Sequence, residues 1–225
     1  ASILRALAPH LPQVLLGDAL AMALAIIGDE EARVKALGAL VPYLPVELLD
    51  EALTAARAIE GEYWRARALQ ALANYLPAVQ QATVYAEALD AARAIGHAQA
   101  QADALGALAA HLPQELLREA LAVAQAIGEE RWQAKALAAL APHLPSDQQS
   151  TVYGEALAAA RAIESAQARA EGLRALAPHL PPEQQGEVYG EALAAVQAIR
   201  DEYWQSSVLT ALAPHVPSDQ QATVY

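Results

Sequence analysis

The sequence predicts an all-α fold: an α-solenoid of about seven antiparallel helix pairs, wound into a right-handed superhelix. The first observation behind this prediction is a Leu-Pro step, Val-Pro in its last copy, that recurs along the chain. Its prolines are Pro12, Pro45, Pro77, Pro113, Pro145, Pro181 and Pro217. Consecutive prolines lie 33, 32, 36, 32, 36 and 36 residues apart. A period of this length is typical of stacked helix pairs and not of one globular domain.

The first helix of each unit precedes the Leu-Pro step. Leucines stand eight and five residues before the proline, as Leu69 and Leu72 do before Pro77. With the residue just before the proline they give the i, i+3, i+7 spacing of one helical face. For this unit they predict a helix over about residues 61–76. In five units another proline stands three residues earlier and should end the helix there. These prolines are Pro9, Pro42, Pro142, Pro178 and Pro214.

The second helix of each unit follows the proline. Its stripe begins at an acidic residue, followed one, two and eight positions later by Ala, Leu and Ile. In three units the acidic residue lies six positions past the proline, and in three others ten. Four residues are about one helical turn, so we expect short and long second helices with the same apolar face. The six acidic residues are Asp18, Glu51, Glu87, Glu119, Glu155 and Glu191.

Two of the helix starts carry a Ser-Asp-Gln-Gln sequence, at residues 146–149 and 218–221. A serine followed three positions later by glutamine is the pattern of a capping box, in which the serine caps the helix. We therefore expect Ser146 to be an N-cap.

The whole chain is predicted to be a single repeat array. Its units span approximately 1–28, 29–60, 61–96, 97–128, 129–164, 165–200 and 201–225. The first and last units are shorter than the others and carry no polar capping repeat, which solenoids ordinarily have. We expect the sequence to be a window from a longer array, or a protein built from one.

Composition excludes several classes of function. Without cysteine, neither a disulfide framework nor a thiolate metal site can form. Prolines and charges interrupt every apolar stretch, and no basic leader precedes one, so we expect no membrane span and no signal peptide. The formal net charge of −12 argues against nucleic acid as a partner. Together these features predict a cytoplasmic protein.

A column of histidine and tyrosine stands two residues before the prolines. Its members are His10, Tyr43, Tyr75, His111, His143, His179 and His215. Equivalent positions in stacked helix pairs are about 10 Å apart, too far to share a metal ion with ligand bonds of about 2 Å. We expect a packing role and no metal.

Tryptophan alternates with alanine thirteen residues before the proline. The series is Ala32, Trp64, Ala100, Trp132, Ala168 and Trp204. One interpretation is packing, with each tryptophan filling the space beside the alanine of the next unit. The other is a row of anchors for a partner, because tryptophan and tyrosine dominate interface energetics. The pairs Tyr63-Trp64 and Tyr203-Trp204 favour the second interpretation.

The acidic residues of the second helices also admit two interpretations. A solvated face, or ion pairs with neighbouring arginines, is the structural one. A concave acidic track that selects basic groups of a peptide, formed by Glu87, Glu119 and Glu155, is the functional one. One carboxylate per unit is not a catalytic pair, which needs two carboxyl groups about 5–10 Å apart in one cleft. No phosphate-binding loop, nucleophile elbow or zinc-binding helix motif occurs either. We therefore expect no catalytic residue, no enzyme activity and no cofactor.

The unit resembles the tetratricopeptide and HEAT-like superfamily of α-solenoids. Residues 139–145, Ala-Leu-Ala-Pro-His-Leu-Pro, followed by Glu-Ala-Leu and Ala-Arg-Ala-Ile within 155–163, are similar to repeats in large bacterial proteins. The tetratricopeptide signature residues themselves are missing. The resemblance implies that such an array serves as a sensor, since some of these proteins join the repeats to a NACHT-type signalling ATPase.

Two functions follow as hypotheses. In the first, the chain is a scaffold that binds a protein or peptide through Trp64, Trp132 and Trp204. In the second, it is a natural or engineered assembly module that stacks end to end into homo-oligomers. An α/α-barrel enzyme is disfavoured, because no set of polar residues is predicted to converge.

Overall fold

The computed structural model describes residues 2–26 and 28–212, and in this part of the chain the regular structure is helical throughout. The predicted all-α class is confirmed. Pro217, His215 and the second Ser-Asp-Gln-Gln sequence lie outside the described residues.

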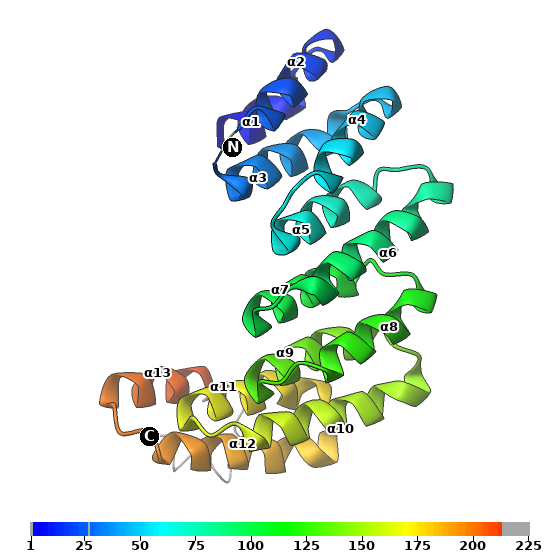
Figure 1. The fold of residues 1–225 in the computed structure, drawn as a ribbon. Coiled ribbons are helices and arrows are strands. Elements are labelled where there is room, and N and C mark those ends of the chain that lie inside the picture. The colour runs from blue at the N-terminus through cyan, green and yellow to red at the C-terminus, as the bar shows by residue number, and fades with distance from the viewer. Residues whose placement is uncertain (1, 27, 213–225) are drawn as a thin grey trace. The chain divides into compact units, whose positions relative to one another are not determined.

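The helices alternate between the two kinds that the sequence predicts (Figure 1). The first helices are α1 (Ser2–Leu7), α3 (Glu30–Leu40), α5 (Glu62–Ala73), α7 (Ala98–Ala109), α9 (Glu130–Leu140), α11 (Ala166–Leu176) and α13 (Glu202–Leu212). The second helices are α2 (Gln13–Leu24), α4 (Val46–Arg57), α6 (Ala78–Ala94), α8 (Gln114–Gln125), α10 (Ser146–Ala162) and α12 (Pro182–Gln197). Helices α2, α4 and α8 have 12 residues, whereas α6 and α10 have 17 and α12 has 16. The two lengths are therefore confirmed.

In the described units the extra prolines end the first helices as expected, whereas Pro214 lies outside the described residues. Helix α3 stops at Leu40, and a 3-10 turn with Pro42 at its second position follows over Val41–Tyr43. Proline has no N–H to continue the α-helical ladder, and its ring clashes with the preceding turn. Equivalent 3-10 turns occupy Ala8–His10, Ala141–His143 and Ala177–His179.

The predicted capping box at Ser146 is wrong. The N-cap of α10 is Pro145, and the helix start carries no side-chain cap hydrogen bond. The amide of Gln149 donates instead to the carbonyl of Leu144 at 2.9 Å, which closes the end of the preceding turn. Because Pro145 takes the extended conformation at the cap, Ser146 becomes the first helical residue and loses the capping position.

The same glutamine contact recurs in the other long units. The amides of Gln81 and Gln185 donate to the carbonyls of Leu76 and Leu180, each at 2.9 Å. In the short units the position four residues past the proline holds a leucine. These leucines, Leu16, Leu49 and Leu117, are buried. Long and short units thus join their two helices by different means, one polar and one apolar.

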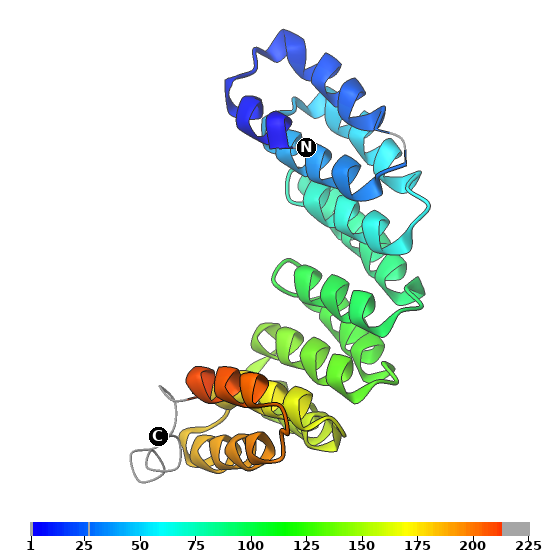
Figure 2. The same ribbon diagram turned by 90° about the vertical axis from the view of Figure 1, so that its left-hand side faces the viewer.

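The chain divides into two compact parts, residues 1–120 and 121–225. In the first part α3, α5 and α7 lie beside one another, with α4 and α6 on the other side (Figure 1). In the second part α9 packs on α10 and α11, and α13 packs on α11 and α12 (Figure 2). Within each part the principal contacts join helices that are at most two apart along the chain. This pattern is compatible with a helical repeat array.

Alanine and leucine make the core. Leu69, Leu72 and Ala68 of α5 are at most 1% exposed, and the equivalent residues of α9 are just as deeply buried. Burying a leucine contributes about 1.5–3 kcal/mol to folding relative to leaving it exposed. The first helices of successive units also contact one another, α5 with α3 and α7, and α9 with α11, so each unit packs on its neighbours.

Candidate functional site

The tryptophans lie in the first turns of first helices. Trp64 of α5 and Trp132 of α9 are half-buried, whereas Trp204 of α13 is 44% exposed. Tyr63 is half-buried and meets Trp64 edge to face, with ring centroids 4.8 Å apart. Tyr203 is 75% exposed and meets Trp204 in the same way at 5.4 Å. All five predicted aromatic residues therefore keep part of their surface accessible.

The predicted carboxylates lie on the other set of helices. Glu87, Glu119 and Glu155 belong to the second helices α6, α8 and α10. Each contacts a side chain at the C-terminal end of the preceding second helix. Tryptophans and carboxylates are thus supplied by different helices of the unit.

These contacts form a series with a constant register. Arg57 donates two hydrogen bonds to Glu87, at 2.8 and 2.7 Å, and Arg161 does the same to Glu191 at 2.8 and 2.5 Å. The hydrogen bonds that the guanidinium groups donate to the carboxylates raise the pKa of both arginines. Glu87 and Glu191 thus form ion pairs with neighbouring arginines, as the structural interpretation of these acidic residues expects. A basic ligand would have to compete with the protein's own arginines for these carboxylates.

Two further contacts continue the series. Arg93 reaches Glu119 with a single contact of 3.4 Å, and the amide of Gln125 donates to Glu155 at 2.7 Å. Gln125 occupies the position of the arginines, so this link has no counter-charge.

The tyrosines that come with the four extra residues are almost completely buried. Tyr85, Tyr153 and Tyr189 are 3%, 8% and 4% exposed, and burial raises the pKa of each phenol. The repeat pattern alone did not assign them to the core. The signal that could have done so is their spacing. Tyr85 precedes Ala88, Leu89 and Ala92 of the apolar stripe by three, four and seven positions, which places it on the same helical face.

Two of these tyrosines are linked to the histidine column, Tyr153 directly and Tyr85 through Asn74. The ring of Tyr153 stacks on His179 of the next unit, with centroids 5.8 Å apart. The Tyr85 hydroxyl donates to the Asn74 side chain at 2.5 Å, and Asn74 lies 3.5 Å from the His111 ring. The column therefore contributes contacts between units. Among the described residues no three metal-ligating side chains come together.

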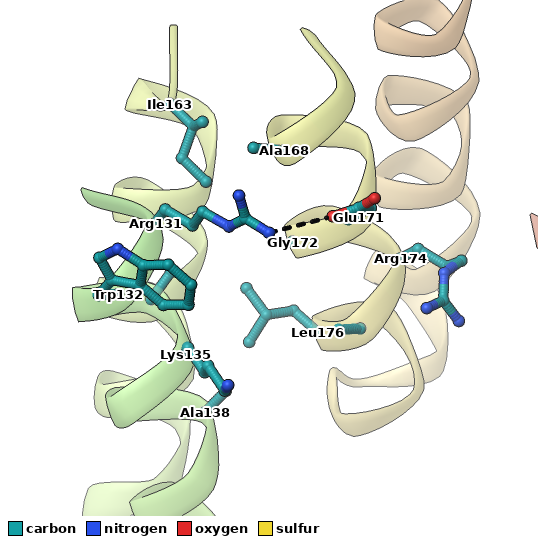
Figure 3. A pocket seen from close by; sticks show the side chains of 12 residues that line it. Arg131, Trp132, Lys135, Ala138, Ile163, Ala168, Glu171, Gly172, Arg174 and Leu176 are labelled. Carbon is teal, nitrogen blue, oxygen red and sulfur yellow. Dashed lines mark hydrogen bonds and ion pairs between the residues drawn. The ribbon is translucent and has the colours of Figure 1, made fainter. Parts of the chain in front are cut away.

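A groove opens beside Trp132, between α9 and α11. Its volume is about 320 Å³, and Trp132 lines it together with Ala138, Ile163, Ala168 and Leu176. In Figure 3 the Leu176 side chain points into the space between the helices, towards the Trp132 side. The packing interpretation expects Trp132 to fill the space beside Ala168. Because both residues line the same hollow, Trp132 does not fill that space completely.

Charged side chains stand at the edge of this groove. The Arg131 guanidinium lies 4.8 Å from the Trp132 ring centroid and the Lys135 ammonium lies 5.4 Å from it, both within cation–π range. Arg131 also reaches across to Glu171 of α11 at 3.5 Å (Figure 3). Arg174 lines the α11 side, with its guanidinium directed away from Trp132. These edge residues carry three positive charges and one negative charge.

Trp64 has the opposite electrostatic surroundings. The cavity beside it is lined by four carboxylates and one arginine: Asp29, Glu30, Glu31, Glu60 and Arg33. Three of these carboxylates have structural contacts. Asp29 accepts a hydrogen bond from the backbone of Ala32 at 2.7 Å, Glu30 accepts one from Gly61 at 3.3 Å, and Glu31 forms an ion pair with Lys35. Sequence alone did not separate the two tryptophans, because the neighbouring unit supplies much of the charge around each.

Within residues 2–26 and 28–212, no helix has the length and apolar character that crossing a membrane requires. A comparison of the chain with protein-family models gives no match, and no curated protein matches it significantly.

Proposed function

We propose that this protein is a non-enzymatic scaffold, an α-solenoid of about seven helix pairs that binds a protein or peptide along its first helices. The observation that carries the proposal is the open groove at Trp132. A half-buried indole beside a mostly apolar hollow of about 320 Å³ is the kind of surface that anchors a side chain of a partner. The resemblance to bacterial sensor arrays favours a role as the sensing part of a larger cytoplasmic signalling protein.

The test is a selection from a phage-displayed library of random peptides on the immobilised protein. The wild type is compared with the triple variant Trp64→Ala/Trp132→Ala/Trp204→Ala. The proposal expects peptides that are enriched on the wild type and lost on the variant, while far-UV circular dichroism stays unchanged. Equal enrichment on both proteins, or no enrichment on either, would contradict it. Loss of helicity in the variant would assign the tryptophans to the core.

A second candidate function is self-association. Helix α2 exposes three large apolar side chains, Val14 at 84%, Leu15 at 44% and Met22 at 68%. Apolar surface of this kind favours association between copies. Sedimentation velocity over a concentration series tests it with the variant Val14→Ser/Met22→Ser. If the protein self-associates, its apparent mass rises with concentration in the wild type and rises less in the variant. A wild-type mass that stays at the monomer value excludes self-association.

A further inference from the structure

We infer that the Trp132 groove binds an acidic peptide segment, with an apolar side chain against the indole and a neighbouring carboxylate beside Arg131 and Lys135. The inference rests on the proposed scaffold function and names the chemical class of its partner.

The shape and lining of the groove suit an apolar side chain. Small-molecule and side-chain pockets begin at about 300 Å³, and this one has about 320 Å³. Trp132, Ile163 and Leu176 supply large apolar surfaces, and the alanines between them leave the hollow open. Gly172 also lines the groove, where the equivalent residue of the unit at 97–128 is the buried Ala104. A single aliphatic or aromatic side chain of a peptide fits this space.

The charged side chains at the edge of the groove suit a carboxylate. Arg131 and Lys135 lie beside the indole, and Glu171 is the one carboxylate of the lining, whereas the chain as a whole has 14 lysines and arginines against 26 aspartates and glutamates. The ion pair between Arg131 and Glu171 is long, at 3.5 Å, with side chains 51% and 36% exposed. Exposed pairs of this kind are weak, so a peptide carboxylate can compete with Glu171 for Arg131.

The cavity at Trp64 provides the internal contrast. Its four carboxylates repel an acidic segment, although the aromatic anchor is the same. The charge around the tryptophan, and not the tryptophan alone, therefore decides which peptide binds at Trp132.

The test uses three acetylated and amidated peptides: Gly-Leu-Glu-Glu-Leu-Gly and its counterparts with Gln or Lys in place of both Glu. In the full chain with Trp64→Phe/Trp204→Phe, Trp132 is the only tryptophan and its fluorescence reports the groove. The Glu peptide should cause a saturable change that weakens with added salt, because screening acts on exposed charges. The Gln peptide should bind more weakly, and the Lys peptide should cause no saturable change. A Lys peptide that binds as well as the Glu peptide overturns the inference.

Two variants in the same background locate the binding. Lys135→Gln should lower the affinity for the Glu peptide about two- to fivefold. Ala138→Leu should abolish the saturable fluorescence change, because the larger side chain fills the groove. The matched control is Arg67→Gln, which removes one positive charge at the equivalent position of the Trp64 unit. It should leave the affinity unchanged, and equal weakening by Arg67→Gln and Lys135→Gln overturns the inference.

The outcome separates this inference from the proposed function. If none of the three peptides binds, while the phage library still yields peptides that the triple tryptophan variant loses, the groove inference fails and the scaffold stands. If the library yields no such peptides, the scaffold proposal itself fails.

Discussion

Arg57 and Glu87, thirty positions apart in sequence, form a two-pronged ion pair with N–O distances of 2.8 and 2.7 Å. Arg57 ends α4 and Glu87 lies in α6, so the pair joins the second helices of successive units. The same register joins Arg161 to Glu191 in the other part of the chain. The ion pairs therefore help to fix how one unit is placed on the next.

A double-mutant cycle with Arg57→Ala and Glu87→Ala measures this coupling. Both side chains are partly exposed, at 48% and 33%, so solvent screens the pair. We expect a coupling of about 0.5–1 kcal/mol in the free energy of urea unfolding at low salt. The control cycle on Arg93 and Glu119, with one contact of 3.4 Å, should give a smaller value. A larger coupling in the control pair would contradict this account.

Replacing Gly172 with alanine should stabilise the protein. A Cβ added there meets the Ile163 side chain at 3.4 Å and that of Ala160 at 3.6 Å, which is ordinary contact. Glycine inside a helix is about 0.5–1 kcal/mol less favourable than alanine. Urea unfolding of Gly172→Ala should show a gain of this size. A loss of stability would mean that the helices at Gly172 approach too closely to admit a methyl group.

The correction at the start of α10 gives a paired prediction. Gln149→Ala removes the hydrogen bond to the Leu144 carbonyl and should lower the free energy of unfolding by about 1 kcal/mol. Ser146→Ala should change it by less than about 0.5 kcal/mol, because the serine makes no capping hydrogen bond. Thermal unfolding of the two variants distinguishes them. The reverse order would restore Ser146 as the cap.

Stability should fall in alkaline solution above pH 10. Burial raises the pKa of Tyr85, Tyr153 and Tyr189 above the ordinary 10.0, so these phenols keep their protons in the native state after the unfolded chain begins to lose them. The unfolded state then binds fewer protons, and the free energy of unfolding decreases as pH rises. The contribution of the protonated phenols to the free energy of unfolding is fully present below pH 10.

In the variant Tyr153→Phe/Tyr189→Phe, the free energy of unfolding should decrease less steeply above pH 10 than in the wild type. Urea unfolding between neutral and alkaline pH measures this difference. Tyr203→Phe is the control, because Tyr203 is 75% exposed. An identical alkaline slope in the wild type and the double variant would show that the buried phenols do not cause it.

The repeat pattern predicts the helices well because each helix needs only a local signal. Leu69 and Leu72 mark a buried face, Pro77 marks the turn, and the position of Glu87 distinguishes a long second helix from a short one. These features depend on helical periodicity and on the missing N–H of proline, and both are properties of the local sequence.

The groove could not be predicted in the same way. Trp132 is visible in the sequence, but Glu171 and Leu176 reach it from a neighbouring helix about forty residues later. Their placement depends on how α9 and α11 pack against each other. The sequence of either helix alone does not determine this packing. The hydrogen bond from Gln149 to the Leu144 carbonyl could not be predicted for a similar reason, because a Ser-x-x-Gln spacing fits a capping box equally well.

Hydrogen–deuterium exchange of the wild-type chain, with and without saturating Gly-Leu-Glu-Glu-Leu-Gly peptide, tests the central claim most directly. Binding in the groove predicts slower exchange confined to Glu130–Leu140 and Ala166–Leu176, the two helices that line it. Slower exchange in Glu62–Ala73 instead, or no change in α9 and α11, would contradict it.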